Sequence, residues 1–300
     1  MEYPLVSFVS LTYNHKKFIE DTIAGALSQE YPNLEIIISD DCSPDGTFEV
    51  MKQYIHKHPT NKNIILNGNE KNMGLVSHLN YLMQNYVHGD IVVLAGGDDV
   101  SMPNRVQDTV DYLIKNPRVV AVTGQADIID GAGNFIARYE NIPVGTYALD
   151  ESYIRTTTFM CGGPGLAFWR HEVWDRFGLL DAQCQTEDST LRFRALLCGN
   201  IAVLDKVFLK YRIHGNNMSI GKNVYKLKTK EIARQYSRDL IRAKELSLIS
   251  ECTAKRLQRK IRLYYYNREL SKKLSQSKYR LYKVIYKLMN KVVNKAVKKI

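Results

Sequence analysis

The sequence predicts an α/β fold in which helices cover both faces of a mostly parallel sheet. Over about the first 124 residues, short apolar and β-branched runs alternate with segments of helical spacing. The strand-like runs are continuously apolar, which is typical of strands buried on both faces. Ligands of such sheets bind beyond the carboxyl ends of the strands, so the loops at those ends are the first candidates for a site.

The strands and helices of this first part alternate in chain order. Residues 16–29 place their apolar side chains on one side of a helix, and residues 47–58 and 75–86 also have helical spacing. A proline begins the helix expected over 103–115, at an early position where proline is tolerated. The strands expected between these helices span residues 6–12, 35–39, 63–66, 90–95 and 119–123.

The pattern changes after about residue 124. Residues 127–139 indicate a hairpin around a glycine-rich turn, and glycines interrupt residues 161–169 before another strand. A helix over 186–198 and a strand over 202–211 follow. From about residue 226 the chain is helical in pattern, polar and basic to its end.

Charge divides the chain into two parts. Residues 1–224 carry 19 Lys and Arg against 26 Asp and Glu, a net charge of −7. Residues 225–300 carry 23 against 5, a net charge of +18. We therefore expect a first domain over 1–224 and a basic, tyrosine-rich helical region over 225–300, each facing different partners.

The composition excludes several classes of protein. With 45% hydrophobic and 24% charged residues, the chain can bury a sizeable core and does not have a disordered composition. The five cysteines are odd in number and form no CxxC pair, which indicates free thiols in a reducing compartment. The sequence shows no spanning apolar run and no secretory signal at its start, so we expect a cytoplasmic protein.

The loops after the first four predicted strands carry acidic, amide or glycine residues. The carboxyl ends of parallel strands meet at one edge of a sheet, so we expect these loops to converge there. In chain order they are Thr12-Tyr13-Asn14, the stretch 40–47, Asn72-Met73-Gly74 and Gly96-Gly97-Asp98-Asp99.

Three acids in these loops have a functional and a structural interpretation. Adjacent Asp98 and Asp99 repel one another, and a hard cation such as Mg²⁺ or Mn²⁺ would relieve that repulsion. The alternative for this pair is a turn that caps the helix over 103–115. Asp40 could meet a base or ribose, or it could form an Asx-turn at the start of its loop.

Two further candidates lie downstream. Glu187 and Asp188 begin a predicted helix, where negative charge is favourable and where a carboxylate could also take a proton from a hydroxyl. His214 follows a predicted strand, and it could contact phosphate or a metal, or make only local hydrogen bonds.

Taken together, these stretches resemble the inverting family 2 glycosyltransferases, which have the GT-A fold. The resemblance covers roughly residues 4–219 and is most specific from the first strand through DDCSPDGT. It implies a Rossmann-like nucleotide-binding half, an acceptor-binding half and a C-terminal basic helical extension. The matching pieces are VSFVSLTYNHKKFIEDTIAGALSQEYPNLEIIISDDCSPDGT, NMG, GGDDVSMPNRV, GGPGLAFWRHEVWDRFGLLD, TEDSTLRFRALLCG and YRIHGNN.

The resemblance implies a role for each matching residue. Asp188 would be the catalytic base, supported by Glu187, and Asp99 with Asp98 would coordinate the metal ion. Gly163 and Trp169 would shape the acceptor site. The nucleotide-sugar site would contain Thr12, Tyr13, Asn14, Asp40, Asn72, Gly74, Asp98 and His214, with Asp40 on the base.

The implied reaction transfers a sugar from a nucleotide-sugar donor, UDP-linked in the commonest case, to a hydroxyl of a saccharide acceptor. Asp188 would draw the proton from the hydroxyl, Mn²⁺ or Mg²⁺ would neutralise the leaving diphosphate, and the anomeric configuration would invert. The acceptor would be a lipid-linked saccharide or a surface glycan, because the basic sequence of residues 278–300 suggests contact with a membrane surface.

Two departures from the family pattern qualify this expectation. The first acid of the D-x-D-D pattern is missing, because Gly96 stands in its place. The chain also lacks the Q-x-x-R-W motif of processive synthases, which predicts transfer of one sugar per encounter.

Two alternatives remain open at this point. A sugar-1-phosphate nucleotidyltransferase shares a related sheet, although its glycine-rich first loop reads LTYNHKKF here. A non-catalytic, membrane-associated scaffold is the other, and the presence of Asp40, Asp98, Asp99 and Asp188 argues against it.

The last stretch, residues 278–300, has the pattern of a basic amphipathic helix. One side would be apolar and the opposite side rich in lysine, as in helices that bind anionic membrane surfaces. The alternative is that the apolar side packs on the first domain or on a second copy in a homodimer. Nucleic acid is the least favoured partner, because no recognised nucleic-acid motif is present. We therefore expect a peripheral protein at the cytosolic face of the membrane.

Overall fold

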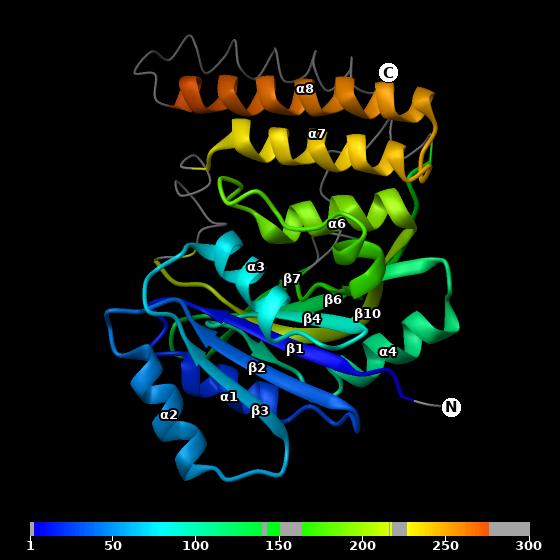
Figure 1. The fold of residues 1–300 in the computed structure, drawn as a ribbon. Coiled ribbons are helices and arrows are strands. Elements are labelled where there is room, and N and C mark those ends of the chain that lie inside the picture. Colours follow the sequence, from blue (N-terminus) through cyan, green and yellow to red (C-terminus); the bar gives the residue numbers. More distant parts are fainter. Residues whose placement is uncertain (1–2, 140–142, 151–163, 216, 218–226, 276–300) are drawn as a thin grey trace.

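The computed structural model describes residues 3–139, 143–150, 164–215, 217 and 227–275. Within these residues a ten-stranded mixed sheet lies between two layers of helices, and further helices stack on one of these layers (Figure 1). This arrangement confirms the predicted α/β fold class, a large sheet flanked by helices with helices at the C-terminal end.

One half of the sheet is parallel and follows the predicted alternation. Its strands run in the order β3-β2-β1-β4 and are β1 (Val6–Thr12), β2 (Leu34–Asp40), β3 (Asn63–Gly68) and β4 (Ile91–Gly96). The helices that follow them are α1 (Ile19–Leu27), α2 (Thr47–Lys57), α3 (Leu75–Asn85) and α4 (Arg105–Lys115).

The other half of the sheet is mixed. The short strand β9 (Ala167–Trp169) is antiparallel to both β4 and β6 (Val119–Ile129). Strand β6 pairs in parallel with β10 (Asn200–Arg212). The hairpin predicted over 127–139 is present as the end of β6 paired with β7 (Phe135–Tyr139), and β8 (Gly145–Tyr147) pairs with β10.

A two-residue strand, β5 (Val100–Ser101), joins the two halves. It follows β4 in the chain but pairs with β10, antiparallel and at the far side of β9 and β6. Asp98 and Asp99 therefore lie where the chain crosses from one half of the sheet to the other.

Alternating side chains of the buried strands fill two cores, one on each face of the sheet. On β1, Val9 and Leu11 face the layer of α3 and α6 (Glu187–Cys198), and Phe8 faces the layer of α1, α2 and α4. Burial on both faces explains why the strand runs are continuously apolar.

The basic region after residue 224 packs on the first part of the chain. Helix α7 (Thr229–Glu245) lies on α6, and α8 (Glu251–Ser275) lies on α7 (Figure 1). A third core of apolar side chains from all three helices joins them, and it includes Phe193, Tyr236 and Leu257. The change of charge at residue 224 is thus a change of composition within a continuous packed structure.

The helices of the described residues include no membrane-spanning candidate, because none combines sufficient length with sufficient apolar character. The expected amphipathic segment over 278–300 lies outside the described residues.

Candidate active site

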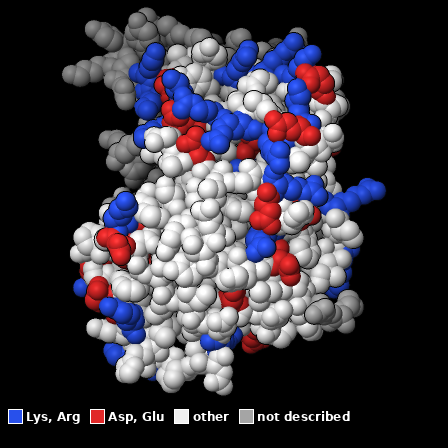
Figure 2. Space-filling model, in the orientation of Figure 1, with Lys and Arg blue, Asp and Glu red and all other residues white. Residues whose placement is uncertain are grey.

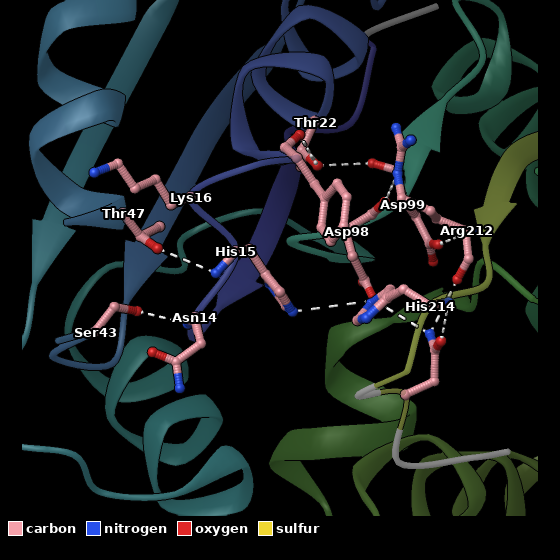
Figure 3. A network of polar contacts seen from close by, with 12 residues as sticks. Asn14, His15, Lys16, Thr22, Ser43, Thr47, Asp98, Asp99, Arg212 and His214 are labelled. Atoms are coloured by element: carbon pink, nitrogen blue, oxygen red, sulfur yellow. Dashed lines mark hydrogen bonds and ion pairs between the residues drawn. The ribbon is translucent and has the colours of Figure 1, made fainter. Parts of the chain in front are cut away.

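The loops after β1 and β2 are fastened together at the carboxyl edge of the sheet. The backbone N–H of Asn14 donates to Ser43 Oγ at 2.8 Å, and that of His15 donates to Thr47 Oγ1 at 3.1 Å (Figure 3). Asn14 holds a positive φ of 60°, a left-handed conformation that asparagine tolerates better than most residues. Thr12 is buried at the end of β1, and the side chain of Tyr13 is exposed.

Asp40 ends β2 and organises its own loop. Its Oδ2 accepts from the Ser43 backbone N–H at 2.8 Å, and its Oδ1 accepts from the Ser43 hydroxyl at 2.5 Å. Burial raises the pKa of Asp40, and the two bonds from Ser43 oppose that rise. Asp40 therefore forms the local turn that was one of its two interpretations. It also lies at the same edge of the sheet as the other candidate loops.

The neighbouring Asp41 holds the loop after β3. Its carboxylate accepts from the backbone N–H groups of Met73 at 2.9 Å and Gly74 at 2.8 Å, and from Asn69 Nδ2 at 2.9 Å. Asn72 Oδ1 also accepts from Gly74 N–H at 2.9 Å, and Gly74 has a φ of 80° that favours glycine. The loops after β1, β2 and β3 therefore form one connected unit.

Asp98 lies between two histidines from distant parts of the chain. Its Oδ2 is 2.9 Å from His214 Nε2 and 4.0 Å from His15 Nε2 (Figure 3). Asn217 Nδ2 also reaches Asp98 Oδ2, at 3.5 Å. The structure thus brings together the predicted residues Asp98 and His214, together with His15, which the sequence interpretation did not select.

Asp99 is bound to the backbone of the neighbouring strand β10. Its Oδ1 accepts from the backbone N–H of Arg212 at 2.9 Å, and its backbone carbonyl accepts from Thr22 Oγ1 at 2.9 Å. Burial, and then the charge of Asp98, raise the pKa of Asp99 well above its usual value, while Arg105 and Arg212 oppose the rise.

Arg212 and Arg105 supply positive charge beneath the acids. Arg212 is buried at the end of β10, donates from Nε to the Asp98 carbonyl at 2.9 Å and from Nη2 to Asp21 at 2.7 Å, and stacks over Phe18. Arg105 is also buried, where it donates to Ser101 and to the carbonyl of Leu94. Burial lowers the pKa of Arg105 to about 10.

The donor set around Asp98 fits a divalent cation. One ligand atom each from His15, Asp98 and His214 lies within 4.8 Å of the others, and this cluster is the one that the described residues offer. Burial lowers the pKa of His15, which favours the neutral imidazole that metals bind. Asp99, which the resemblance implies as the metal ligand, is not a member of this cluster.

Glu187 and Asp188 begin α6, as predicted. Asp188 is half-exposed, its Oδ2 is paired with Arg192 Nη1 at 2.8 Å, and its Oδ1 accepts from the Ser189 backbone N–H at 2.6 Å. Burial, and then the charge of Asp188, raise the pKa of Glu187 to about 7. No hydrogen bond or ion pair links Asp188 to Asp98 within the described residues.

One of the two acceptor residues implied by the resemblance lies away from the acids. Trp169 ends β9 and is in register with Ile91 at the start of β4, whereas the acids follow the end of β4 at Gly96. Because β9 is antiparallel to β4, Trp169 is carried away from the acid-bearing edge and packs in the core on the α1, α2 and α4 face. Gly163 lies outside the described residues.

Comparison with known proteins decides the family. The sequence profile described as Glycosyl transferase family 2 matches residues 7–177, which is more than half of the chain. The chain belongs to this family. An uncharacterized glycosyltransferase of Haemophilus influenzae is 26% identical over 245 residues, covering 79% of this chain and 73% of the relative. EpsE of Bacillus subtilis, a provisionally named glycosyltransferase, is 35% identical over 113 residues, and the match spans 38% of this chain and 40% of EpsE.

Solved structures agree on the fold of this family 2 glycosyltransferase. The structure of S. aureus TarS 1–349 with UDP-GlcNAc matches with a TM-score of 0.65 at 20% identity, over 89% of this chain and 73% of that one. The mannosyltransferase PcManGT of Pyrobaculum calidifontis, solved with GDP-Man and Mn²⁺, matches with a TM-score of 0.58 at 17% identity, over 99% of this chain and 87% of that one.

Sequence reasoning missed several residues at the site of this family 2 glycosyltransferase. His15 faces Asp98, Arg212 binds the Asp98–Asp99 segment and Arg105 acts on Asp99 through its charge, and the sequence interpretation gave none of the three a role. His15 had one signal, since it stands in the loop after the first strand, where ligands of parallel sheets bind.

Proposed function

We propose that this enzyme transfers one sugar per encounter from a nucleoside diphosphate sugar to a saccharide hydroxyl, with inversion at the anomeric carbon. The observation that carries the proposal is the convergence of Asp98, His15 and His214 at the edge where the loops after β1 and β2 also meet. Similar structures were solved with UDP-GlcNAc and with GDP-Man, which supports a nucleotide sugar as the donor and a UDP-sugar as the first to test.

The base in this proposal is Asp188. Arg192 and the Ser189 backbone N–H orient its carboxylate at the start of α6, where the helix dipole favours negative charge. Asp188 takes the proton from the acceptor hydroxyl as that oxygen bonds to the anomeric carbon. The bond from this carbon to the diphosphate breaks, and its electron pair leaves with the nucleoside diphosphate. Orientation of both substrates supplies much of the acceleration.

A divalent cation, Mn²⁺ or Mg²⁺, belongs to this proposal. Asp98 would hold it with His214 beside it, while Asp99, the other metal ligand that the resemblance implies, accepts from the Arg212 backbone N–H. When bound, the ion supplies Lewis-acid neutralisation of charge on the diphosphate. Thr12, Tyr13, Asn14 and Asp40 would line the nucleotide, because their loops surround the same edge.

We further propose that the acceptor is a lipid-linked saccharide or surface glycan met at an anionic membrane surface. Relatives include a teichuronic acid biosynthesis glycosyltransferase named for Bacillus subtilis and a chondroitin synthase of Escherichia coli, which fits polysaccharide biosynthesis. Lys and Arg gather over α7 and α8 (Figure 2). The exposed stripe of α8, spaced at helical intervals, consists of Lys255, Arg259, Arg262, Tyr266 and Lys273.

The charge of this stripe suits lipid headgroups. Each basic residue near an anionic surface contributes roughly 1 kcal/mol, and a tyrosine suits the headgroup level. Residues 278–300, which lie outside the described residues, are also basic in sequence.

The decisive experiment is a screen of sugar nucleotides for release of nucleoside diphosphate, repeated with acceptor saccharides and the best donor. We expect Mn²⁺-dependent release that acceptor accelerates, and a product of inverted anomeric configuration by NMR. Asp188→Asn should lose at least 100-fold in kcat, on the order expected for a general base, while the exposed acid change Asp175→Asn should not. Release of pyrophosphate would identify a nucleotidyltransferase instead, and absence of any nucleotide-sugar binding would favour a scaffold.

A further inference from the structure

We infer that His15 is a protein ligand of the divalent cation and takes the place of the acid that is missing at Gly96. This inference rests on the proposed function, because the cation is the one proposed there. It concerns a residue to which the sequence interpretation gave no role, and it links two features of one chain: a glycine where an acid is usual, and a mostly buried imidazole facing that glycine-containing loop.

The Gly96-Gly97 backbone makes room for the imidazole. A Cβ at Gly97 would lie 2.5 Å from His15 Nδ1 and 2.5 Å from Thr12 Cβ, closer than any side chain tolerates. A Cβ at Gly96 would lie 2.8 Å from Asp98 Oδ1. A side chain at either position would therefore displace His15 or Asp98, and the imidazole occupies space that the second glycine leaves open.

The fold holds His15 at this point without using its ring nitrogens. The backbone N–H of His15 bonds to Thr47, and its carbonyl accepts from the N–H groups of Phe18 and Ile19 at the start of α1. The ring is mostly buried, with a side-chain exposure of 18%, and its Nδ1 is buried with no hydrogen-bond partner. The nitrogen that faces the carboxylate is Nε2, which lies 4.0 Å from Asp98 Oδ2, too far for a direct hydrogen bond and a separation that a cation between the two atoms can bridge.

The second histidine completes the set from the opposite side. His214 Nε2 is 2.9 Å from the same oxygen, Asp98 Oδ2, that His15 Nε2 faces at 4.0 Å. The two rings meet edge to face, with centroids 6.3 Å apart. Both imidazoles and the carboxylate thus approach one position, and they come from three segments far apart in the chain.

This ligand set predicts which ion the site prefers. Mg²⁺ binds oxygen ligands and keeps its waters, whereas imidazole suits transition metals. Two imidazoles and one carboxylate therefore favour Mn²⁺ over Mg²⁺, a narrower expectation than the sequence allows.

Direct Mn²⁺ binding tests the inference without any turnover. Titration of the full-length protein with Mn²⁺ by electron paramagnetic resonance, with and without UDP, gives the dissociation constant. We expect His15→Gln to weaken Mn²⁺ binding at least tenfold, and the matched control His58→Gln, a change on the exposed end of α2, to leave it unchanged. His15→Asp should retain Mn²⁺ and bind Mg²⁺ more tightly than the wild-type protein does. Thermal unfolding of each variant verifies that it is folded.

The outcomes separate this inference from the proposed function. Wild-type Mn²⁺ affinity in a folded His15→Gln variant, or absence of Mn²⁺ binding by the wild-type protein in both conditions, overturns the role of His15. Mn²⁺ binding that depends on His15 in a protein that transfers no sugar would retain the ligand and reject the proposed function.

Discussion

The ion pair between α6 and α7 allows a quantitative prediction. Arg194 Nη2 lies 3.0 Å from Asp239 Oδ1, and both side chains are almost completely buried, with exposures of 0% and 3%. Arg194 Nη1 also donates to the Gly178 carbonyl at 2.8 Å, and Gln235 Nε2 donates to Asp239 at 2.9 Å. Asp239→Ala would leave the guanidinium buried without its counter-charge, which typically costs about 3–5 kcal/mol.

Replacing both partners should cost much less than removing one. In Arg194→Met with Asp239→Leu, apolar side chains of similar size fill the space and no buried charge remains, so we expect most of the stability to return. Urea unfolding followed by tryptophan fluorescence measures both, because Trp174 lies beneath Arg194, with the guanidinium carbon 5.9 Å from its ring. The exposed pair Arg242–Glu245 provides the control, and Glu245→Ala should change the free energy of unfolding by under about 1 kcal/mol.

Two results would refute this reasoning. A loss of less than about 1 kcal/mol in Asp239→Ala would show that the pair is not a buried electrostatic link. A double variant that loses as much as the single one would show that packing, not charge, dominates.

Three further predictions concern other parts of the molecule. Because the pKa of Glu187 is raised to about 7 from 4.5, the folded state holds its proton more tightly than the unfolded chain, so its contribution to stability is present below about pH 4.5 and is lost as pH rises through 7. Relative to Glu187→Gln, the wild-type protein should therefore lose stability between pH 5 and pH 8, and parallel pH profiles would contradict this. Asp41→Asn places an NH₂ group against N–H groups of the 69–74 loop that now donate to the carboxylate, so we expect a stability loss of about 1–3 kcal/mol. We also expect a higher KM for the sugar nucleotide, and an unchanged KM would argue against a nucleotide-binding role for that loop. Arg259→Glu with Arg262→Glu should weaken sedimentation with anionic vesicles by roughly 30-fold or more, from about 1 kcal/mol per basic residue, whereas binding equal to the wild type would exclude the α8 stripe as the contact.

The sequence could predict the parallel half of the sheet because its signal is local. Continuous apolar runs and helical spacing locate β1 to β4 and the helices between them to within a few residues. Strands of two or three residues, such as β5, β8 and β9, carry no periodic signal, because their pairing depends on partners far along the chain. The π-helical turn His171–Asp175 likewise has no pattern that distinguishes it from an α-helical one.

The sequence could predict the acidic residues of the site, but it could not predict which residues they contact. Asp98 and Asp188 stand in recognisable motifs, but the contact of Asp98 with His214 spans 116 positions of the chain. Composition also obscured the role of the C-terminal helices. The many lysines and arginines after residue 224 indicate a separate basic region, whereas Tyr236 and Asp239 lie on the side of α7 that is buried against α6.

The path of the chain after β4 has a consequence for how the molecule responds to a ligand. The segment from Asp98 to Ser101 connects two strands that are not neighbours in the sheet, because β9 and β6 lie between β4 and β10. Arg212 is bound to this segment from the β10 side, through the carboxylate of Asp99 and the carbonyl of Asp98. A donor bound to Asp98 would therefore be linked to both strands. Its binding should slow the local unfolding of β4 and of β10 together, rather than protect one strand alone.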